Sequence, residues 1–171
     1  MKTGYMLAMQ NSHEGMSDAG MIRNELCIAE QAEEFGFDVI WCAEHHFDDY
    51  SIAPDNFQLL TWLAARTKKI QLGTAAVILP WNDPLRLAEK ASVLDAMSEG
   101  RFVLGLGRGL ARMEYEAFGI AMNEARDRFD ESAHMIVNAL ETGFIEGTGP
   151  YYPQKRTEIR PRPIYSFKDK L

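Results

Sequence analysis

Short β-rich runs and amphipathic segments alternate in strict order along most of this 171-residue chain, and this alternation constrains the fold more than any other feature. The β-rich runs lie at 5–9, 38–42, 70–79 and 102–106, and helical periodicity follows at 21–35, 56–67, 85–98, 110–118 and 124–142. Strands that are joined through helices run parallel and are covered on both faces. The sequence therefore predicts an α/β fold with four βα units.

The expected helices have residues at their ends that are typical of helix caps. Asp83 precedes Pro84, which places a capping acceptor directly before a proline at the first helical position. Asn123 is predicted to cap the last helix. Gly36, Gly100 and Gly143 are expected to close helices, because glycine adopts the left-handed conformation there at least steric cost.

Two architectures share this alternation, a doubly wound sheet and a (β/α)₈ TIM-type barrel. A complete barrel needs about 250 residues, so four units make either a small open sheet or half a barrel. From Phe144 the pattern changes to turns or a short hairpin followed by extended chain. Residues 163–165 could begin a fifth strand, but no further βα unit follows. We expect one domain over residues 1–171.

Composition narrows the range of partners. Eighteen basic against twenty-five acidic residues give a net charge of −7, which argues against nucleic acid as a partner. No apolar run reaches the roughly 18–20 residues that span a bilayer, and the N-terminus turns polar too early for a signal peptide. We expect a cytoplasmic protein that does not enter a membrane. Cys27 and Cys42 are expected to be reduced core thiols.

Ligands of parallel α/β folds collect at the carboxyl ends of the strands. The second strand is followed by Glu44, His45 and His46, which offer an acid or base near neutral pH. Neighbouring residues on extended chain point in opposite directions, so one histidine at most is expected to face the pocket. A metal site or a hydrogen-bonded pair is the alternative, although His13 is the only other histidine nearby in sequence.

The fourth strand is followed by a glycine-rich stretch, Gly105 to Leu110, directly before a predicted helix. Glycines there let backbone N–H groups approach an anion, and Arg108 could bind phosphate oxygens at the helix N-terminus. A dinucleotide fingerprint is excluded, because it needs glycine where Leu110 stands. Tight packing of strand on helix, with a solvated Arg108, explains the glycines equally well.

Taken together and in order, the motifs resemble those of the bacterial luciferase-like family of flavin-dependent monooxygenases. The resemblance extends from the N-terminus to about residue 145, through the segments 32–38, Trp41, 44–47, 72–76, 84–86, 94–102, 107–109, 118–119 and Arg126. It implies a (β/α)₈ barrel that binds reduced FMN at the carboxyl mouth of its strands. It also implies a homo- or heterodimer.

Carried over by position, the resemblance assigns roles to individual residues. His45 matches the catalytic general base, and His46 is the second histidine of the catalytic pair, which supports His45 from behind without contacting the flavin. Ala75 and Ala76 match a pair joined by a non-prolyl cis peptide beneath the flavin ring. Arg108 and Arg126 match phosphate-binding arginines. The full cofactor-binding set that the resemblance implies is Glu44, Ala75, Ala76, Gly107, Arg108, Leu110 and Arg126.

Two departures limit this comparison. Gly107 stands where luciferase itself has a reactive cysteine, so neither light emission nor a long-chain aldehyde substrate is implied. The chain also has only half the expected number of units, so we interpret it as the N-terminal half of a single barrel domain.

The predicted function is a monooxygenase that uses reduced FMN and O₂ to oxidise a small organic substrate. A separate reductase is expected to supply the reduced flavin, because no nicotinamide-binding fingerprint is present. The alternatives are a deazaflavin-dependent oxidoreductase that needs no oxygen, a non-catalytic flavin-binding protein on a shortened barrel, and a structural half-barrel that only dimerises. No metal site is expected.

Overall fold

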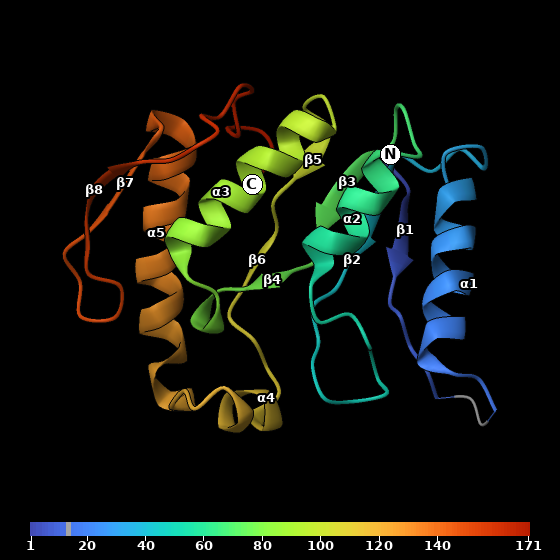
Figure 1. The fold of residues 1–171 in the computed structure, drawn as a ribbon, viewed down its shortest axis with the longest axis horizontal. Coiled ribbons are helices and arrows are strands. Elements are labelled where there is room, and N and C mark those ends of the chain that lie inside the picture. Colours follow the sequence, from blue (N-terminus) through green and yellow to red (C-terminus); the bar gives the residue numbers. More distant parts are fainter. Residues whose placement is uncertain (13–14) are drawn as a thin grey trace.

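The computed structural model describes residues 1–12 and 15–171, in which helices and strands alternate along the chain (Figure 1). The elements are, in chain order, β1 (Gly4–Leu7), α1 (Asp18–Gln31), β2 (Val39–Cys42), α2 (Asn56–Ala64), β3 (Gln71–Thr74), β4 (Val77–Ile78), the 3₁₀ turn η1 (Leu79–Trp81), α3 (Pro84–Met97), β5 (Phe102–Val103), β6 (Leu106–Gly107), α4 (Arg112–Ala117), the 3₁₀ turn η2 (Met122–Glu124), α5 (Ala125–Thr142), β7 (Phe144–Gly147) and β8 (Gln154–Glu158).

The main sheet has four strands in the order β1-β2-β3-β5, and every neighbouring pair is parallel. Ile40 in the second strand lies opposite Tyr5 on one side and Leu72 on the other. Each strand is followed by a helix before the next strand of the sheet begins (Figure 1). The predicted parallel α/β class is confirmed.

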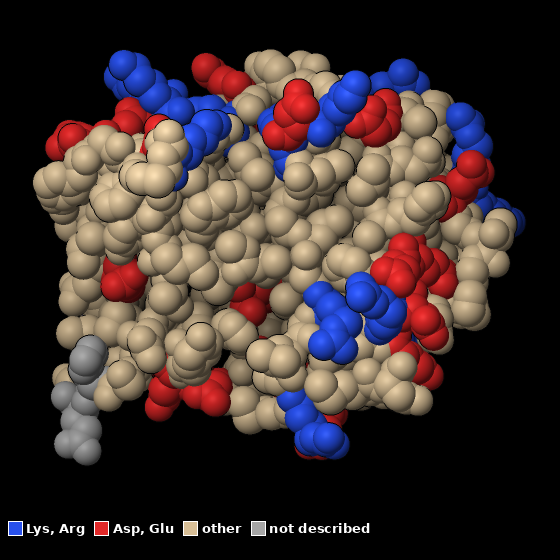
Figure 2. All heavy atoms as spheres, turned by 180° about the vertical axis from the view of Figure 1, so that it is seen from behind, with Lys and Arg blue, Asp and Glu red and all other residues tan. Residues whose placement is uncertain are grey.

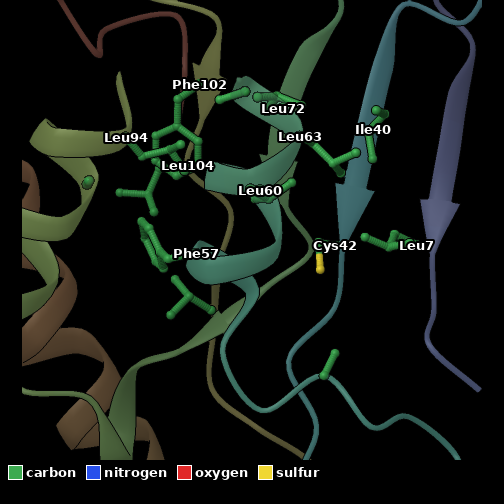
Figure 3. Close-up of a cluster of buried hydrophobic side chains, with 14 of the residues drawn as sticks. Leu7, Ile40, Cys42, Phe57, Leu60, Leu63, Leu72, Leu94, Phe102 and Leu104 are labelled. Atoms are coloured by element: carbon green, nitrogen blue, oxygen red, sulfur yellow. The ribbon is translucent and has the colours of Figure 1, made fainter. Parts of the chain in front are cut away.

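The core lies between this sheet and the helices that cross one of its faces (Figure 3). Alternate strand residues point into it, and α2 and α3 supply the facing side chains. Fully or almost fully buried members that Figure 3 labels are Leu7, Ile40, Cys42, Leu60, Leu63, Leu72, Leu94, Phe102 and Leu104. Burying this apolar area fixes the helices on the sheet and thereby the loops that leave its carboxyl edge.

The predicted helix ends are confirmed at Asp83 and Gly143 and wrong at Asn123. Asp83 caps α3 by accepting a hydrogen bond from the Arg86 N–H at 2.9 Å. Gly143 ends α5 with a φ of 78°. Asn123 does not cap α5, because the chain first forms the 3₁₀ turn η2 and the helix begins only after it. None of the helices in the described residues combines the length and apolar character of a bilayer-spanning segment.

Two predicted strands are each split in the structure. The run 70–79 divides into β3 and β4, and the run 102–106 gives β5, with β6 starting at Leu106. β4 and β6 pair with each other in a separate parallel ladder rather than continuing the main sheet. The Val77 N–H donates to the Gly105 carbonyl at 3.0 Å, where the two ladders meet. The strands therefore bend away together at the edge where the predicted site lies.

The segment after α5 begins with an antiparallel hairpin of β7 and β8, as the turn residues predict. The fifth strand expected at 163–165 is wrong, because this stretch is irregular. The chain instead buries Phe167 in the core, and Lys170 Nζ bonds Asp95 Oδ1 at 2.6 Å. The Leu104 N–H donates to the Lys170 carbonyl at 2.7 Å, so the last residues lie beside the edge strand β5.

No helix of the described residues covers the other face of the sheet (Figure 1). Met6 is 48 % exposed there, beside a half-buried Trp41. The indole of Trp41 lies across its neighbours Gly4 and Gly73: a Cβ on Gly4 would be 2.8 Å from Trp41 Cδ1, and one on Gly73 would be closer still to the ring. In Figure 2 the charged side chains gather towards the rims, and the middle of the face is mostly uncharged.

Candidate functional site

A cavity of about 350 Å³ lies at the carboxyl edge of the strands, between the loop after β2, the turn between β3 and β4, and the loop before α4. Its lining is Glu44, His45, Ala75, Ala76, Ile78, Arg108, Gly109, Leu110 and Glu114. Six predicted site residues therefore meet here: Glu44, His45, Ala75, Ala76, Arg108 and Leu110. A larger hollow of about 570 Å³ between α2 and α3 contains none of the predicted site residues.

His45 is fixed by a buried carboxylate from α4. Its Nδ1 lies 3.1 Å from Oε1 of Glu114, whose side chain is only 2 % exposed. The same oxygen accepts a hydrogen bond from the His46 backbone N–H at 2.9 Å. The His45 side chain is itself 31 % exposed, and the Tyr50 ring meets it edge-on at 5.1 Å. Nε2 of His45 has no hydrogen-bond partner among the described residues, so this nitrogen is free to exchange a proton with a ligand.

His46 occupies a more enclosed position. Its Nε2 lies 3.2 Å from Glu44 Oε1, and its side chain is 11 % exposed. The ring packs edge-on against Phe118 at 4.8 Å and Trp81 at 5.9 Å. His46 lines a neighbouring hollow of about 320 Å³ rather than the main cavity. This arrangement favours His45 as the histidine that meets a ligand in the main cavity.

Glu44 is an anchor for the loops around it. Its carboxylate accepts hydrogen bonds from three donors, Ile78 N–H at 3.0 Å, Trp81 Nε1 at 2.7 Å and Asn82 Nδ2 at 3.2 Å. His46 Nε2 lies within hydrogen-bond distance of the same carboxylate, at 3.2 Å. Three of these contacts are to Oε1 and one, from the Ile78 N–H, is to Oε2. A carboxylate offers about four lone-pair sites, so a further donor would be accepted at Oε2.

The peptide bond between Ala75 and Ala76 is cis, as the family resemblance implies. The Ala75 N–H donates to the Cys42 carbonyl at 2.8 Å, and Nδ2 of the buried Asn56 donates to the Ala76 carbonyl at 3.3 Å. Both side chains are methyl groups, so this part of the lining carries no bulky side chain.

The glycines of the loop before α4 allow close packing. A Cβ on Gly107 would lie 2.8 Å from Ile78 Cδ1 and 3.1 Å from the Ala76 Cβ. Gly109 has a φ of 84°, and a Cβ there would be 2.9 Å from the Trp81 ring. These contacts favour tight packing as the reason for the glycines. The predicted cofactor role of Gly107, which is outside the cavity lining, stays a prediction.

Arg108 lines the cavity and has no acidic partner among the described residues. No ion pair or side-chain hydrogen bond of Arg108 occurs within residues 1–12 and 15–171, and its backbone carbonyl accepts a hydrogen bond from the Tyr115 hydroxyl. Burial raises the pKa of Tyr115, and the nearby Arg108 charge opposes that rise. The predicted helix at 110–118 begins only at Arg112, so Arg108 lies in the loop and not at the first turn of α4.

Arg126 and Leu110 differ in how they relate to the cavity. Leu110 lines it and is 77 % exposed. Arg126 lies in the first turn of α5, with a side chain 70 % exposed and Asp130 Oδ1 at 3.8 Å. It is not part of the lining of the cavity, to which Arg108 contributes. The phosphate role of Arg126 stays a prediction.

Sequence reasoning missed the residues that hold the two histidines. Glu114 lies between Met113 and Tyr115 in a short, charged helix whose composition is typical of a solvent-exposed helix. No local sequence pattern distinguishes Glu114 from Glu116. Trp81 belongs to none of the motifs that the sequence analysis identifies, yet its indole N–H bonds Glu44.

Metal ligation is the alternative role for the histidines. In the part of the chain that the structure describes, no three His, Cys, Asp or Glu side chains form a group that could hold a metal ion. His13 lies outside the described residues.

Comparison with known proteins adds to this geometry. The family profile for luciferase-like monooxygenases matches residues 1–166. The alkanal monooxygenase alpha chain of Photorhabdus luminescens is 34 % identical over 130 residues, covering 76 % of this chain and 36 % of the relative. The oxygenase component of a flavin-dependent trigonelline monooxygenase from Acinetobacter baylyi is 35 % identical over 142 residues, or 82 % of this chain and 39 % of the relative.

Among solved structures, the monooxygenase RslO1 from Streptomyces bottropensis superposes with a TM-score of 0.83 at 34 % identity, covering 99 % of this chain and 51 % of that one. The chain thus spans less than half the length of the two curated relatives. The match extends over the sheet, the helices and the loops that form the cavity. The chain belongs to the luciferase-like monooxygenase family.

Proposed function

We propose that this chain forms the flavin-binding half of a monooxygenase that uses reduced FMN and O₂ to oxidise a small organic substrate. The observation that carries the proposal is one cavity that brings together two small alanines, an arginine with no ion pair among the described residues, and a histidine oriented by a buried acid. The flavin-dependent relative from Acinetobacter baylyi supports the choice of cofactor.

The residues present fit a flavin. Ala75, Ala76 and Gly109 leave the wall free of bulky side chains, as a planar ring system requires. Arg108 can bind a phosphate through charge-assisted hydrogen bonds without first breaking an ion pair within the described chain. The volume of about 350 Å³ lies within the range of about 300–1,000 Å³ that is usual for ligand pockets.

Each group has a separate task in this proposal. Reduced flavin, when bound, supplies two electrons to O₂, of which one oxygen atom enters the substrate and the other leaves as water. Arg108 would hold the phosphate end, and Ala75 and Ala76 would lie against the ring. His45 takes up or returns a proton at Nε2, while Glu114 keeps its ring in place. The aromatic rings of Tyr50, Trp81 and Phe118 limit water near the two histidines.

Binding of FMN tests the cofactor. Replacing Arg108 with Ala removes a charge-assisted contact and should weaken FMN binding by about 1.5–3 kcal/mol, whereas binding of riboflavin, which has no phosphate, should not change. Calorimetric titration of both flavins measures this, and the neighbouring exposed Arg112→Ala is the matched control. Equal affinity of the unaltered protein for FMN and riboflavin would contradict a phosphate site. Preference for the deazaflavin F420 would favour the deazaflavin-dependent alternative.

Turnover tests the role of His45. His45→Ala should abolish substrate oxidation, because the proton acceptor is lost, and leave FMN affinity within a few-fold. Stopped-flow mixing of reduced FMN and oxygen with the protein, followed by analysis of the product, gives both quantities. Turnover retained in His45→Ala would refute the assigned role. Flavin binding without any oxygen consumption by the unaltered protein would favour a non-catalytic flavin-binding protein.

We also propose that residues 1–171 are the N-terminal half of a barrel whose remaining units cover the helix-free face of the sheet. The family match over residues 1–166 and the coverage of 36 % to 39 % of the curated relatives support this interpretation. A flavin reductase as the electron source and a dimeric assembly remain predictions that follow from the same family.

A further inference from the structure

Two consecutive histidines bond two different buried glutamates through different ring nitrogens. Nδ1 of His45 lies 3.1 Å from Glu114, whereas Nε2 of His46 lies 3.2 Å from Glu44. Both carboxylates are almost inaccessible to water, with side chains 2 % and 4 % exposed. A neutral imidazole has one N–H and one lone pair, so the bond at one nitrogen fixes the state of the other.

The other partners of the two acids decide which nitrogen carries the proton. Oε1 of Glu114 already accepts the backbone N–H of His46 at 2.9 Å, which is the role of an ionised carboxylate, a group that only accepts hydrogen bonds. Oε1 of Glu44 likewise accepts the Trp81 indole N–H at 2.7 Å. Each histidine must therefore supply the hydrogen in its own bond to the glutamate.

We infer that Glu114 is a positioning residue that holds neutral His45 as the Nδ1–H tautomer, while Glu44 holds its neighbour His46 as the opposite, Nε2–H tautomer. Nε2 of His45 then carries a lone pair in a side chain that lines the cavity, so it accepts a proton from a ligand there. The inference about tautomers stands on the free protein. Its catalytic consequence rests on the proposed function.

The position of Glu114 in the fold suits this role. The acid comes from α4, 69 positions along the chain from His45, and α4 is held against the site by its aromatic residues. Tyr115 packs against Trp81 at 5.2 Å, and Phe118, directly after the helix, stacks on the same indole at 5.0 Å. The helix thus fixes the carboxylate on one side of His45, and the ring cannot exchange its two nitrogens without breaking the bond.

Nitrogen-15 NMR of the imidazole rings tests the inference directly. Long-range ¹H–¹⁵N correlation spectra at about pH 8.5, well above the ordinary pKa of histidine, distinguish the two neutral tautomers. The spectra are assigned by the loss of one ring in His45→Asn and of another in His46→Asn. We expect Nδ1–H for His45 and Nε2–H for His46. The Nε2–H form at His45 would overturn the inference.

Substitution of Glu114 is the second test of the inference. Glu114→Ala should move His45 towards the Nε2–H tautomer, and Glu114→Gln, which keeps an acceptor oxygen in the same place, should retain Nδ1–H. Glu116→Ala, an identical change at an exposed position of the same helix, should alter nothing. An unchanged His45 spectrum in Glu114→Ala, with the protein folded by circular dichroism, would overturn the inference as well.

Kinetics separate this inference from the proposed function. With reduced FMN and O₂, Glu114→Ala should lower kcat by about 10²-fold or more and leave the KM for reduced FMN nearly unchanged, with partial rescue in Glu114→Gln. A Glu114→Ala variant that keeps full kcat would overturn the catalytic consequence. If the unaltered protein shows no turnover at all, the proposed function fails, and the NMR result alone decides the tautomers.

Discussion

The two cysteines of this chain have thiols in very different surroundings. Cys42 ends β2 and is completely buried, whereas Cys27 is exposed on α1, so the expectation of two core thiols is wrong for Cys27. Burial raises the pKa of the Cys42 thiol to about 12, and the nearby charges of Asp55 and Glu44 act in the same direction. Because the thiolate is the reactive form, the buried thiol is inert at neutral pH.

Thiol titration checks this difference. At about pH 8 the native protein should react with Ellman's reagent at Cys27 alone, and the unfolded protein at both cysteines. The Cys27→Ser variant should show no fast reaction until denaturant is added. If Cys42 reacted in the native protein as quickly as Cys27, the loop beside the candidate site would have to open far more readily than its hydrogen bonds indicate.

At the scale of elements, one carboxylate joins the end of α1 to the start of β3. Oε2 of Glu33 accepts three consecutive backbone N–H groups, from Lys68, Lys69 and Ile70, at 2.8–2.9 Å. Burial by itself raises the pKa of Glu33, but the three N–H donors outweigh it, so the pKa lies below its ordinary value of 4.5. The charged form is therefore favoured by folding.

The stability of the connection should consequently depend on pH. Since the folded pKa is lower than the unfolded one, the contribution of Glu33 is fully present above about pH 4.5 and is lost as the pH falls through the folded value. Urea unfolding should show Glu33→Gln to be less stable than the unaltered protein at about pH 7, and the difference should shrink at about pH 3. The exposed neighbour Glu34→Gln is the control. An equal difference at both pH values would contradict the assignment.

At the scale of the whole molecule, the parallel sheet has one face under helices and the other face open. The apolar side chains on the open face include Met6, which is 48 % exposed, and the half-buried Trp41. The outer strand β1 also presents an edge to which no further strand of the described chain is paired, whereas the last residues of the chain lie beside the other outer strand, β5. Exposed edges and exposed apolar area both favour association with another polypeptide.

The 171-residue chain studied by itself should therefore associate. Sedimentation velocity should detect species larger than a monomer, and Met6→Lys, which places a charge on the open face, should shift them towards the monomer. Ile28→Lys is a matched control, since Ile28 is also 48 % exposed but lies on α1. A monomeric chain, or equal effects of both substitutions, would count against an open face that needs a partner.

Much of this fold follows from local sequence patterns. The order of strands and helices, the cap at Asp83 and the left-handed Gly143 depend on neighbouring residues, and the sequence predicts them. The splitting of the strand at 70–79 could not be predicted in this way, because β4 leaves the main sheet to pair with a distant strand, β6. The prediction that Asn123 caps α5 is wrong because the 3₁₀ turn η2 precedes that helix.

The candidate site likewise contains some residues that the sequence predicts and others that only the structure identifies. His45, the two alanines and Arg108 follow strands, so the rule about carboxyl ends of strands and the family resemblance both find them. Glu114 comes from a helix 69 positions away and looks like any surface acid, so only the folded chain identifies it. The family pattern alone also groups Arg126 with Arg108, although the structure leaves Arg126 outside the cavity.

The indole of Trp41, which lies across Gly4 and Gly73, has an optical consequence. An indole that loses its contact with water emits fluorescence at shorter wavelengths, and this one is half-buried on the open face. Trp62 and Trp81 emit as well, so the contribution of Trp41 is the difference between the spectra of the unaltered protein and of Trp41→Phe. That difference reports whether the open face is in contact with water or covered by another polypeptide.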